Sequence, residues 1–167
     1  MEKSDFKKLL FKTAFCVMAC DGHIDDLEIE EMKRIDSSTA YFNDFDLSDE
    51  LEELIAEVKT KGKLLVVELF QTLRETNLSV VQELLIMEVA LRIINADNII
   101  DENEIKFLNI LRSKLSVENQ ILRDRFGEIS YLKNLNYTKI KKITKGQNQF
   151  IKNIKLPDAD TLSNLEL

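Results

Sequence analysis

Apolar residues recur at helical spacing along most of the chain, and this pattern predicts an all-α fold. Near the start, for example, Phe11, Ala14, Phe15 and Met18 fall on one face of a helix. We expect a compact bundle of about seven helices. Six of them cover residues 4–20, 25–37, 49–61, 63–75, 80–96 and 101–114. The seventh begins after a cap at Ser116 and runs to about residue 133.

Two stretches are less regular. The apolar run at residues 64–67 could form a strand, but apolar residues continue at helical spacing through Leu69, Phe70 and Leu73. That continuation favours a helix buried on most sides. The polar connection at residues 38–47 carries three aromatic residues, which we expect to fasten it to the core: Tyr41, Phe42 and Phe45.

One eight-residue stretch occurs twice, 76 residues apart. Residues 21–28 read DGHIDDLE and residues 97–104 read DNIIDENE, so Asp, Ile, Asp and Glu hold the same four positions. The flanking apolar residues also correspond: Ala14, Val17, Met18, Ile29, Met32 and Ile35 fall on Ala90, Ile93, Ile94, Ile105, Leu108 and Leu111. The repeat predicts two pseudo-equivalent helix–acidic turn–helix units.

Local chemistry predicts a turn between two helices in each copy. Gly22 and Asn98 hold the position where a helix ends, and these residue types enter the left-handed region most readily. Asp25 and Asp101 are good N-caps. A glutamate stands three residues after each cap, Glu28 in the first copy and Glu104 in the second, which is the acidic form of a capping box.

Capping does not explain Asp21 and Asp97. Each stands at the carbonyl end of a helix, where the macrodipole favours a cation over an anion. If the two turns pack face to face, their carboxylates form a cluster of oxygen ligands suited to a divalent cation. The candidate metal ligands are therefore Asp21, Asp25, Glu28, Asp97, Asp101 and Glu104. The cation could be Ca²⁺, Mg²⁺, Mn²⁺ or Zn²⁺, and we expect no organic cofactor.

The octet is not an EF-hand loop. It matches the second half of such a loop, but the first and third ligand positions would be Val17 and Ala19, or Ile93 and Asn95. A loop without acids there cannot complete a calcium shell. A metal-independent interpretation stays open, in which the turn carboxylates cap helices and present an acidic face to a basic protein partner.

The doubled pattern of apolar helix, Asp-Gly-x-Ile-Asp-x-x-Glu and apolar helix resembles the TerB-like (tellurite-resistance TerB) domain family. That domain also forms the N-terminal part of some membrane-anchored J-domain co-chaperones. The resemblance covers about residues 5–115 to 130, with Asn98 replacing the usual Gly in the second copy. It implies an all-helical, non-catalytic domain that binds metal through the six acidic residues named above. It also implies a bacterial stress response, with a protein partner at the inner membrane surface.

Charge is distributed unevenly along the chain. The net charge is −7, but residues 1–128 carry −11 and residues 129–167 carry +4. An acidic body argues against nucleic-acid binding, which needs a basic face. No apolar run approaches the roughly 20 residues of a membrane span. The first residues lack a signal-peptide pattern. We therefore expect a cytoplasmic protein, peripheral to the inner membrane if it acts there.

The composition suits one domain with an extension. We place a TerB-like helical domain at residues 1–130 and a Lys-rich, partly ordered extension at residues 131–167. Seven lysines fall between residues 131 and 156. This segment could meet anionic lipid or an acidic partner as an amphipathic helix, could fold back on the acidic body, or could remain a partly ordered tail.

No catalytic constellation emerges from the remaining reactive residues. Cys16 and Cys20 share a helical face beside His23, but the second copy has Arg92, Ala96 and Ile99 at these positions. We interpret Cys20 as a small core residue and Cys16 as a residue at the boundary of the core, and we expect both to be reduced. His23 is the only histidine, so we expect neither a histidine-based triad nor a multi-histidine metal site. We expect no enzymatic activity.

Overall fold

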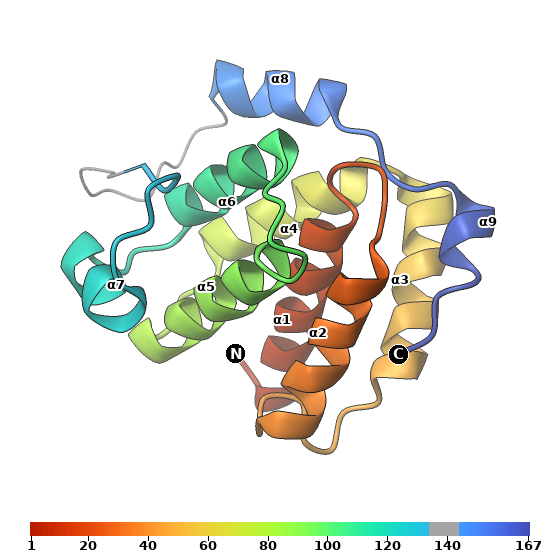
Figure 1. Ribbon diagram of the computed structural model, residues 1–167, viewed down its shortest axis with the longest axis horizontal. Helices are drawn as coiled ribbons and strands as arrows, with labels where there is room; N and C mark the ends of the chain where they lie inside the picture. The colour runs from red at the N-terminus through yellow and green to blue at the C-terminus, as the bar shows by residue number, and fades with distance from the viewer. Residues whose placement is uncertain (134–143) are drawn as a thin grey trace.

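The computed structural model describes residues 1–133 and 144–167, and the described chain is entirely helical. The predicted all-α class is confirmed. Nine helices are present in these two ranges: α1 (Lys3–Met18), α2 (Asp26–Ser38), α3 (Leu47–Lys61), α4 (Leu64–Glu75), α5 (Val80–Ile94), α6 (Glu102–Lys114), α7 (Asn119–Phe126), α8 (Lys145–Asn153) and α9 (Ala159–Leu162) (Figure 1). None of them is long and apolar enough to cross a membrane.

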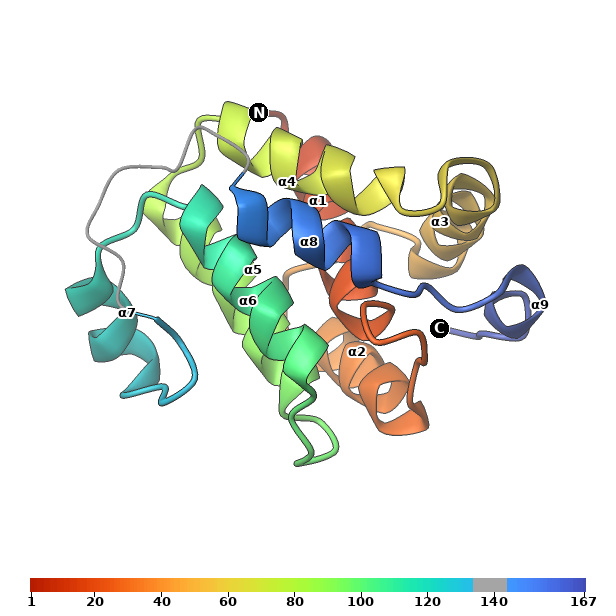
Figure 2. The same ribbon diagram turned by 90° about the horizontal axis from the view of Figure 1, so that it is seen from above.

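Helix α1 lies at the centre of the molecule and packs against α3, α4, α5 and α6 (Figures 1 and 2). Helix α1 is buried on nearly all sides, and its apolar residues accordingly extend beyond one helical face. Its closest partner is α5, and α2 also packs on α5 while α6 packs on α1. The helix that precedes each acidic octet, α1 or α5, therefore lies in the core. The helix that follows the other octet packs against it, α6 on α1 and α2 on α5.

The run at residues 64–67 belongs to helix α4, as predicted. The aromatic connection between α2 and α3 is also fastened to the core. Phe42 is buried and meets Phe11 of α1 edge to face at a centroid distance of 6.2 Å. Tyr41 donates a hydrogen bond to Oε1 of Glu88 on α5, with an O···O distance of 2.7 Å.

Helix α7 is shorter than the sequence predicts. We expected a cap at Ser116 and a helix to about residue 133, but α7 covers residues 119–126 only. The backbone N–H groups of Ser116 and Val117 instead donate to the carboxylate of Glu83 on α5, which holds residues 116–117 outside the helix. At the other end, Gly127 adopts φ +74° and terminates the helix.

The described part of the C-terminal region packs on the rest of the chain (Figure 2). Helix α8 lies on α6, and α9 lies on α3. Phe150, Ile154 and Leu162 are buried in the same core as the other helices. Residues 134–143, the middle of the predicted basic amphipathic segment, lie outside the described residues and include Lys139, Lys141 and Lys142.

Candidate functional site at two acidic turns

The first acidic turn joins α1 to α2 through local hydrogen bonds. The chain reverses at Gly22, which has φ +90°. Oδ1 of Asp21 accepts a hydrogen bond from the backbone N–H of His23 at 2.8 Å. Asp25 then caps α2: its Oδ1 accepts from the N–H of Leu27, and its own N–H donates to Oε2 of Glu28, both at 2.8 Å. The predicted capping box is present.

The second acidic turn, between α5 and α6, has the same bonds at the corresponding positions. Asn98 takes the left-handed conformation with φ +61°. Oδ1 of Asp97 accepts from the N–H of Ile99 at 2.8 Å. Asp101 caps α6, and its N–H donates to Oε2 of Glu104 at 2.7 Å. Asp21 and Asp97 therefore have a local role that the sequence analysis did not assign to them: each closes a turn of side chain and backbone.

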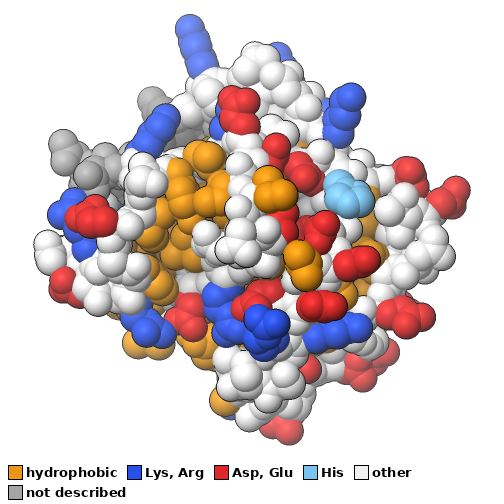
Figure 3. Space-filling model, in the orientation of Figure 1, with side chains coloured by type: hydrophobic (Ala, Val, Ile, Leu, Met, Phe, Trp, Pro, Cys, Tyr) orange, Lys and Arg blue, Asp and Glu red, His pale blue; other side chains and the backbone are white. Residues whose placement is uncertain are grey.

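The two turns lie close enough for their charges to interact. Burial is the main cause that raises the pKa of Glu28 to about 8, and the charge of Glu104 from the other turn contributes to this rise. Burial likewise raises the pKa of Glu104 to about 7, with a contribution from the charge of Asp21 in the first turn. Both glutamates are only 7% exposed. Figure 3 shows acidic side chains gathered over this part of the surface.

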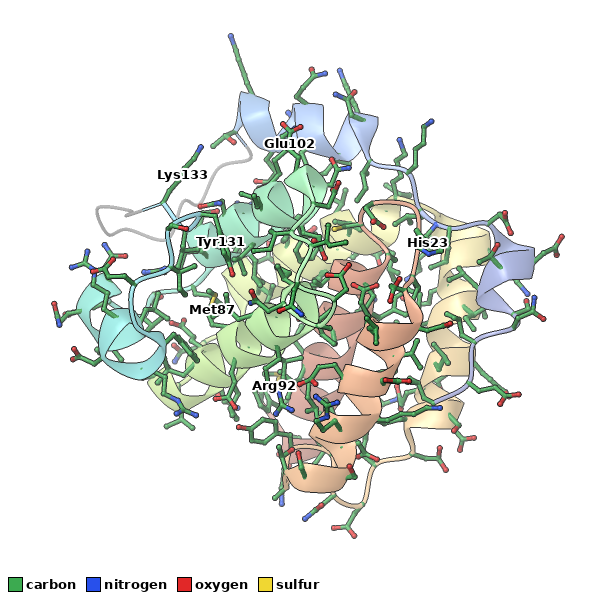
Figure 4. All side chains as sticks on the ribbon, in the orientation of Figure 1. His23, Met87, Arg92, Glu102, Tyr131 and Lys133 are labelled. Carbon is green, nitrogen blue, oxygen red and sulfur yellow. The ribbon has the colours of Figure 1, made fainter. Side chains whose placement is uncertain are left out.

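In the described parts of the chain, the acidic residues of the two turns have no basic side chain as an ion-pair partner. Within residues 1–133 and 144–167, the ion pairs of the molecule leave out all six candidate ligands; the nearest in sequence joins Lys106 to Glu102, on the surface of α6. Figure 4 shows Glu102 pointing outward from this region. Among the described residues, the carboxylates of the cluster accept hydrogen bonds from backbone N–H groups but form no ion pair.

The carboxylates fit a divalent cation by chemistry but not by position. Hard cations take oxygen ligands, and the two turns supply six carboxylates. In the described part of the chain, however, no three acidic, cysteine or histidine side chains are placed to share one ion. One oxygen of each of these six carboxylates accepts a hydrogen bond from a backbone N–H group. A cation would have to bind through the remaining oxygens or draw Glu28 and Glu104 away from their caps.

The cysteines beside the first turn do not form a soft-metal site with His23. Both thiols are buried, whereas His23 is exposed at the turn (Figure 4). Burial raises the pKa of Cys16 to about 12. Burial also raises the pKa of Cys20 well above its usual value, and the charges of Glu104 and Asp21 add to this effect. Both thiols therefore lie in the core, as predicted for Cys20, whereas the boundary position predicted for Cys16 is wrong, because α1 is buried on that side as well.

Two features of this surface were missed by sequence reasoning. Leu27 and Ile99 stand one in each turn with 46% and 72% of their surface exposed, so apolar side chains lie among the carboxylates. Figure 3 shows hydrophobic atoms between the acidic ones on this face. Sequence reasoning could have found both residues, because Leu27 falls on the outward face of α2 and Ile99 lies in the turn, outside both flanking helices. The first turn is also covered by Lys155, whose carbonyl oxygen would lie 3.0 Å from a Cβ at Gly22.

Comparisons of the chain with protein-family models, with curated proteins and with solved structures give no match.

Proposed function

We propose that this chain is a non-catalytic, TerB-like stress-response module whose two acidic turns together bind one divalent cation. The observation that supports the proposal is that Glu28 and Glu104, from turns 76 residues apart, are both 7% exposed, with the charge of Glu104 among the causes that raise the pKa of Glu28. Two buried carboxylates held near each other repel, and a cation between them would replace that repulsion by attraction. The doubled octet supports the TerB-like assignment and the pseudo-equivalence of the two units.

The six acidic residues would have different roles in this site. Asp21 and Asp97 are the direct ligands, because the hydrogen bonds they form with the described residues lie within the turns, and losing these bonds leaves both helix caps intact. Glu28 and Glu104 complete or bridge the site with the oxygen atoms that do not accept from the caps. Asp25 and Asp101 divide their oxygens between capping and the cation.

The test is thermal unfolding of chelator-treated protein with and without millimolar Ca²⁺, Mg²⁺, Mn²⁺ or Zn²⁺. A ligand that binds only the folded state stabilises it by RT ln(1 + [L]/Kd), about 2.7 kcal/mol at 100 times Kd. We expect a saturable rise in melting temperature with at least one ion. The variant Asp21→Asn with Asp97→Asn should abolish the rise, while the control Asp5→Asn with Asp49→Asn, at two exposed positions outside the turns, should retain it.

A second candidate function is favoured by the capping bonds and by the exposed apolar pair. In it, the acidic face is a metal-independent docking surface for a basic protein partner, such as one at the cytoplasmic face of the inner membrane. Leu27 and Ile99 would then contact apolar side chains of the partner. Under this alternative no ion raises the melting temperature, and binding of the partner weakens as salt screens the charges. Absence of any ion effect would therefore reject the cation site and leave the docking surface.

A further inference from the structure

The lysines of the C-terminal region have no acidic side chains near them in the sequence. Residues 129–157 contain seven lysines and no aspartate or glutamate, although the whole chain has 30 acidic residues. Four of these lysines belong to the described part of the chain, and all four are exposed: Lys133, Lys145, Lys152 and Lys155. We call these four side chains the lysine face.

Helix α8 lies at the outer edge of the molecule and carries the centre of the lysine face (Figures 1 and 2). Lys145 and Lys152 are about two helical turns apart, so they lie on the same side of α8, roughly 10 Å from each other along its axis. Another side of α8 packs inward on α6, where Phe150 is 5% exposed. Lys133 lies beside the start of α8, because it lines one cavity with the first residues of that helix, and Lys155 follows the end of α8.

The positive charge of the lysine face is not compensated by ion pairs. Several lysines elsewhere on the molecule are paired with glutamates: Lys8 with Glu50, Lys61 with Glu68 and Lys106 with Glu102. The ion pairs of the described residues leave out all four members of the lysine face. Residues 134–143 lie outside the described part of the chain, but their sequence contains no acid that could pair with these lysines. The lysine face therefore holds unpaired positive charge on a chain whose net charge is −7.

The chemistry of this face favours one kind of anionic partner. A small anion is held by groups that converge on it, whereas the two lysines of α8 stand about two turns apart. A protein interface has an apolar centre, but the exposed side chains of α8 are polar: Lys145, Asn148, Gln149, Lys152 and Asn153. Nucleic-acid sites add arginine forks or aromatic stacking to positive charge, and the lysine face has neither. The surface of an anionic bilayer requires only several lysines close together.

We propose that the lysine face docks the protein on the surface of an anionic lipid bilayer. Attachment is by charge and without insertion, because α8 already packs its apolar side on α6. Acidic side chains elsewhere on the molecule do not cancel the attraction, since charges more than a Debye length apart, about 10 Å at 0.1 M salt, are largely screened. Lys155 lies against the first acidic turn and contributes least, whereas Lys145 and Lys152 contribute most. The proposed cation site has no part in this docking.

Sedimentation with lipid vesicles tests the proposal on the full chain, in the presence of a chelator. The wild-type chain should bind vesicles of equal parts phosphatidylglycerol and phosphatidylcholine, and it should not bind vesicles of phosphatidylcholine alone. Raising the salt from about 0.05 to about 0.5 M should release the protein, because screening removes an attraction that is due to charge. The variant Lys145→Gln with Lys152→Gln should bind at least tenfold more weakly, since each lysine near an anionic surface contributes roughly fivefold in affinity.

The matched control is Lys3→Gln with Lys33→Gln, which removes the same charge at two exposed positions outside the lysine face and should bind as the wild type does. The proposal fails if the wild-type chain does not bind the anionic vesicles at low salt, or if the two double variants lose affinity equally. The helical circular dichroism should stay constant when vesicles are added, and a large increase would show that a segment folds into the bilayer instead. Stronger binding to duplex DNA than to the vesicles at the same salt, dependent on Lys145 and Lys152, would overturn the assignment to lipid.

Discussion

Glu104 acts on Glu28 across the two acidic turns. Burial is the main cause that raises the pKa of Glu28 to about 8, and the charge of Glu104 is the largest contribution from another carboxylate. Each glutamate has the same place in its own turn, as the third residue of a helix that accepts from the N–H of the capping Asp. The capping bonds hold each glutamate in its own turn, and the packing of the helices brings the two turns together. The cost of the repulsion between the two acids depends on pH and on any cation present.

The first prediction is that the cation-free protein loses stability as the pH rises from about 5 to about 8. An unfolded glutamate titrates near 4.5, whereas the folded-state pKa is about 8 for Glu28 and about 7 for Glu104. The folded protein binds more protons than the unfolded chain in this window, so the stabilising contribution is complete below 4.5 and is lost as the pH rises through 7 to 8. At about 1.4 kcal/mol per pKa unit, the loss is on the order of a few kcal/mol.

Urea unfolding at several pH values between 5 and 8 checks this prediction. Glu28→Gln with Glu104→Gln removes the titration but keeps an acceptor for each cap, so the pH dependence should flatten. The other groups around the two glutamates are the same in the wild type and in this variant: Cys20, Asp21, Asp25, Asp97 and Asp101. A wild-type stability that is constant or rises with pH over this range would contradict the raised pKa values.

Sequence reasoning succeeded where the determining contacts are local. The capping boxes at Asp25 and Asp101 involve residues no more than three positions apart, so composition and spacing alone identified them. It failed where distant residues decide the structure. The start of α7 is set by Glu83, 33 and 34 residues before the N–H groups that it accepts from. The position of α9 is set by burial of Leu162 against the core.

The candidate site shows the same division. Each turn could be predicted by itself, but the approach of Glu28 to Glu104 depends on the packing of α1 against α5. Long-range packing also makes the two turns differ, because Lys155, far along the chain, lies against Gly22 and covers the first turn. No local pattern in either octet contains this information.

The second prediction is that Gly22→Ala destabilises the protein by roughly 1–3 kcal/mol, since the residue has φ +90° and an added Cβ would meet the carbonyl oxygen of Lys155 at 3.0 Å. Asn98→Gly should be neutral or stabilising by a few tenths of a kcal/mol, because Asn98 already has φ +61° and glycine adopts it freely. Gly146→Ala is the matched control: the position is helical with ordinary φ, and its added Cβ would have Thr144 Oγ1 at 3.9 Å.

Chemical denaturation of the three variants distinguishes backbone strain from the general effect of adding a methyl group. Gly146→Ala should gain roughly 0.5–1 kcal/mol, as expected for glycine replaced within a helix. Equal effects of Gly22→Ala and Gly146→Ala would show that neither the left-handed conformation nor the Lys155 contact matters for stability.

The third prediction is that Cys16 and Cys20 do not react with a thiol reagent in the folded protein at pH 8. Both are buried, and burial raises the pKa of Cys16 to about 12 and that of Cys20 well above its usual value. The thiolate is the reactive form, so low access and high pKa act together. Absorbance on addition of Ellman's reagent should rise by two thiols only after denaturant is added, and rapid modification in buffer would instead indicate a reactive cysteine site.

The last prediction concerns the carboxylate that shapes the connection between α6 and α7. Oε2 of Glu83 accepts from the N–H groups of Ser116 and Val117 at 2.7 and 2.5 Å. Glu83 is 2% exposed and also interacts with the buried guanidinium of Arg112, whose pKa is lowered to about 10 by burial while the charge of Glu83 opposes that shift. Glu83→Ala removes the acceptor of two backbone donors and the counter-charge of a buried arginine, so we expect a loss of roughly 3–5 kcal/mol.

Glu83→Gln keeps one acceptor oxygen but not the charge, so its cost should fall between those of the wild type and Glu83→Ala. Glu118→Ala provides the control, because Glu118 is an exposed N-cap of α7 that makes no side-chain capping bond. Its effect on the free energy of unfolding should stay within about 0.5 kcal/mol. If Glu83→Ala cost no more than Glu118→Ala, the carboxylate could not be what holds residues 116–117 outside the helix. The short length of α7 would then have to follow from Gly127 alone.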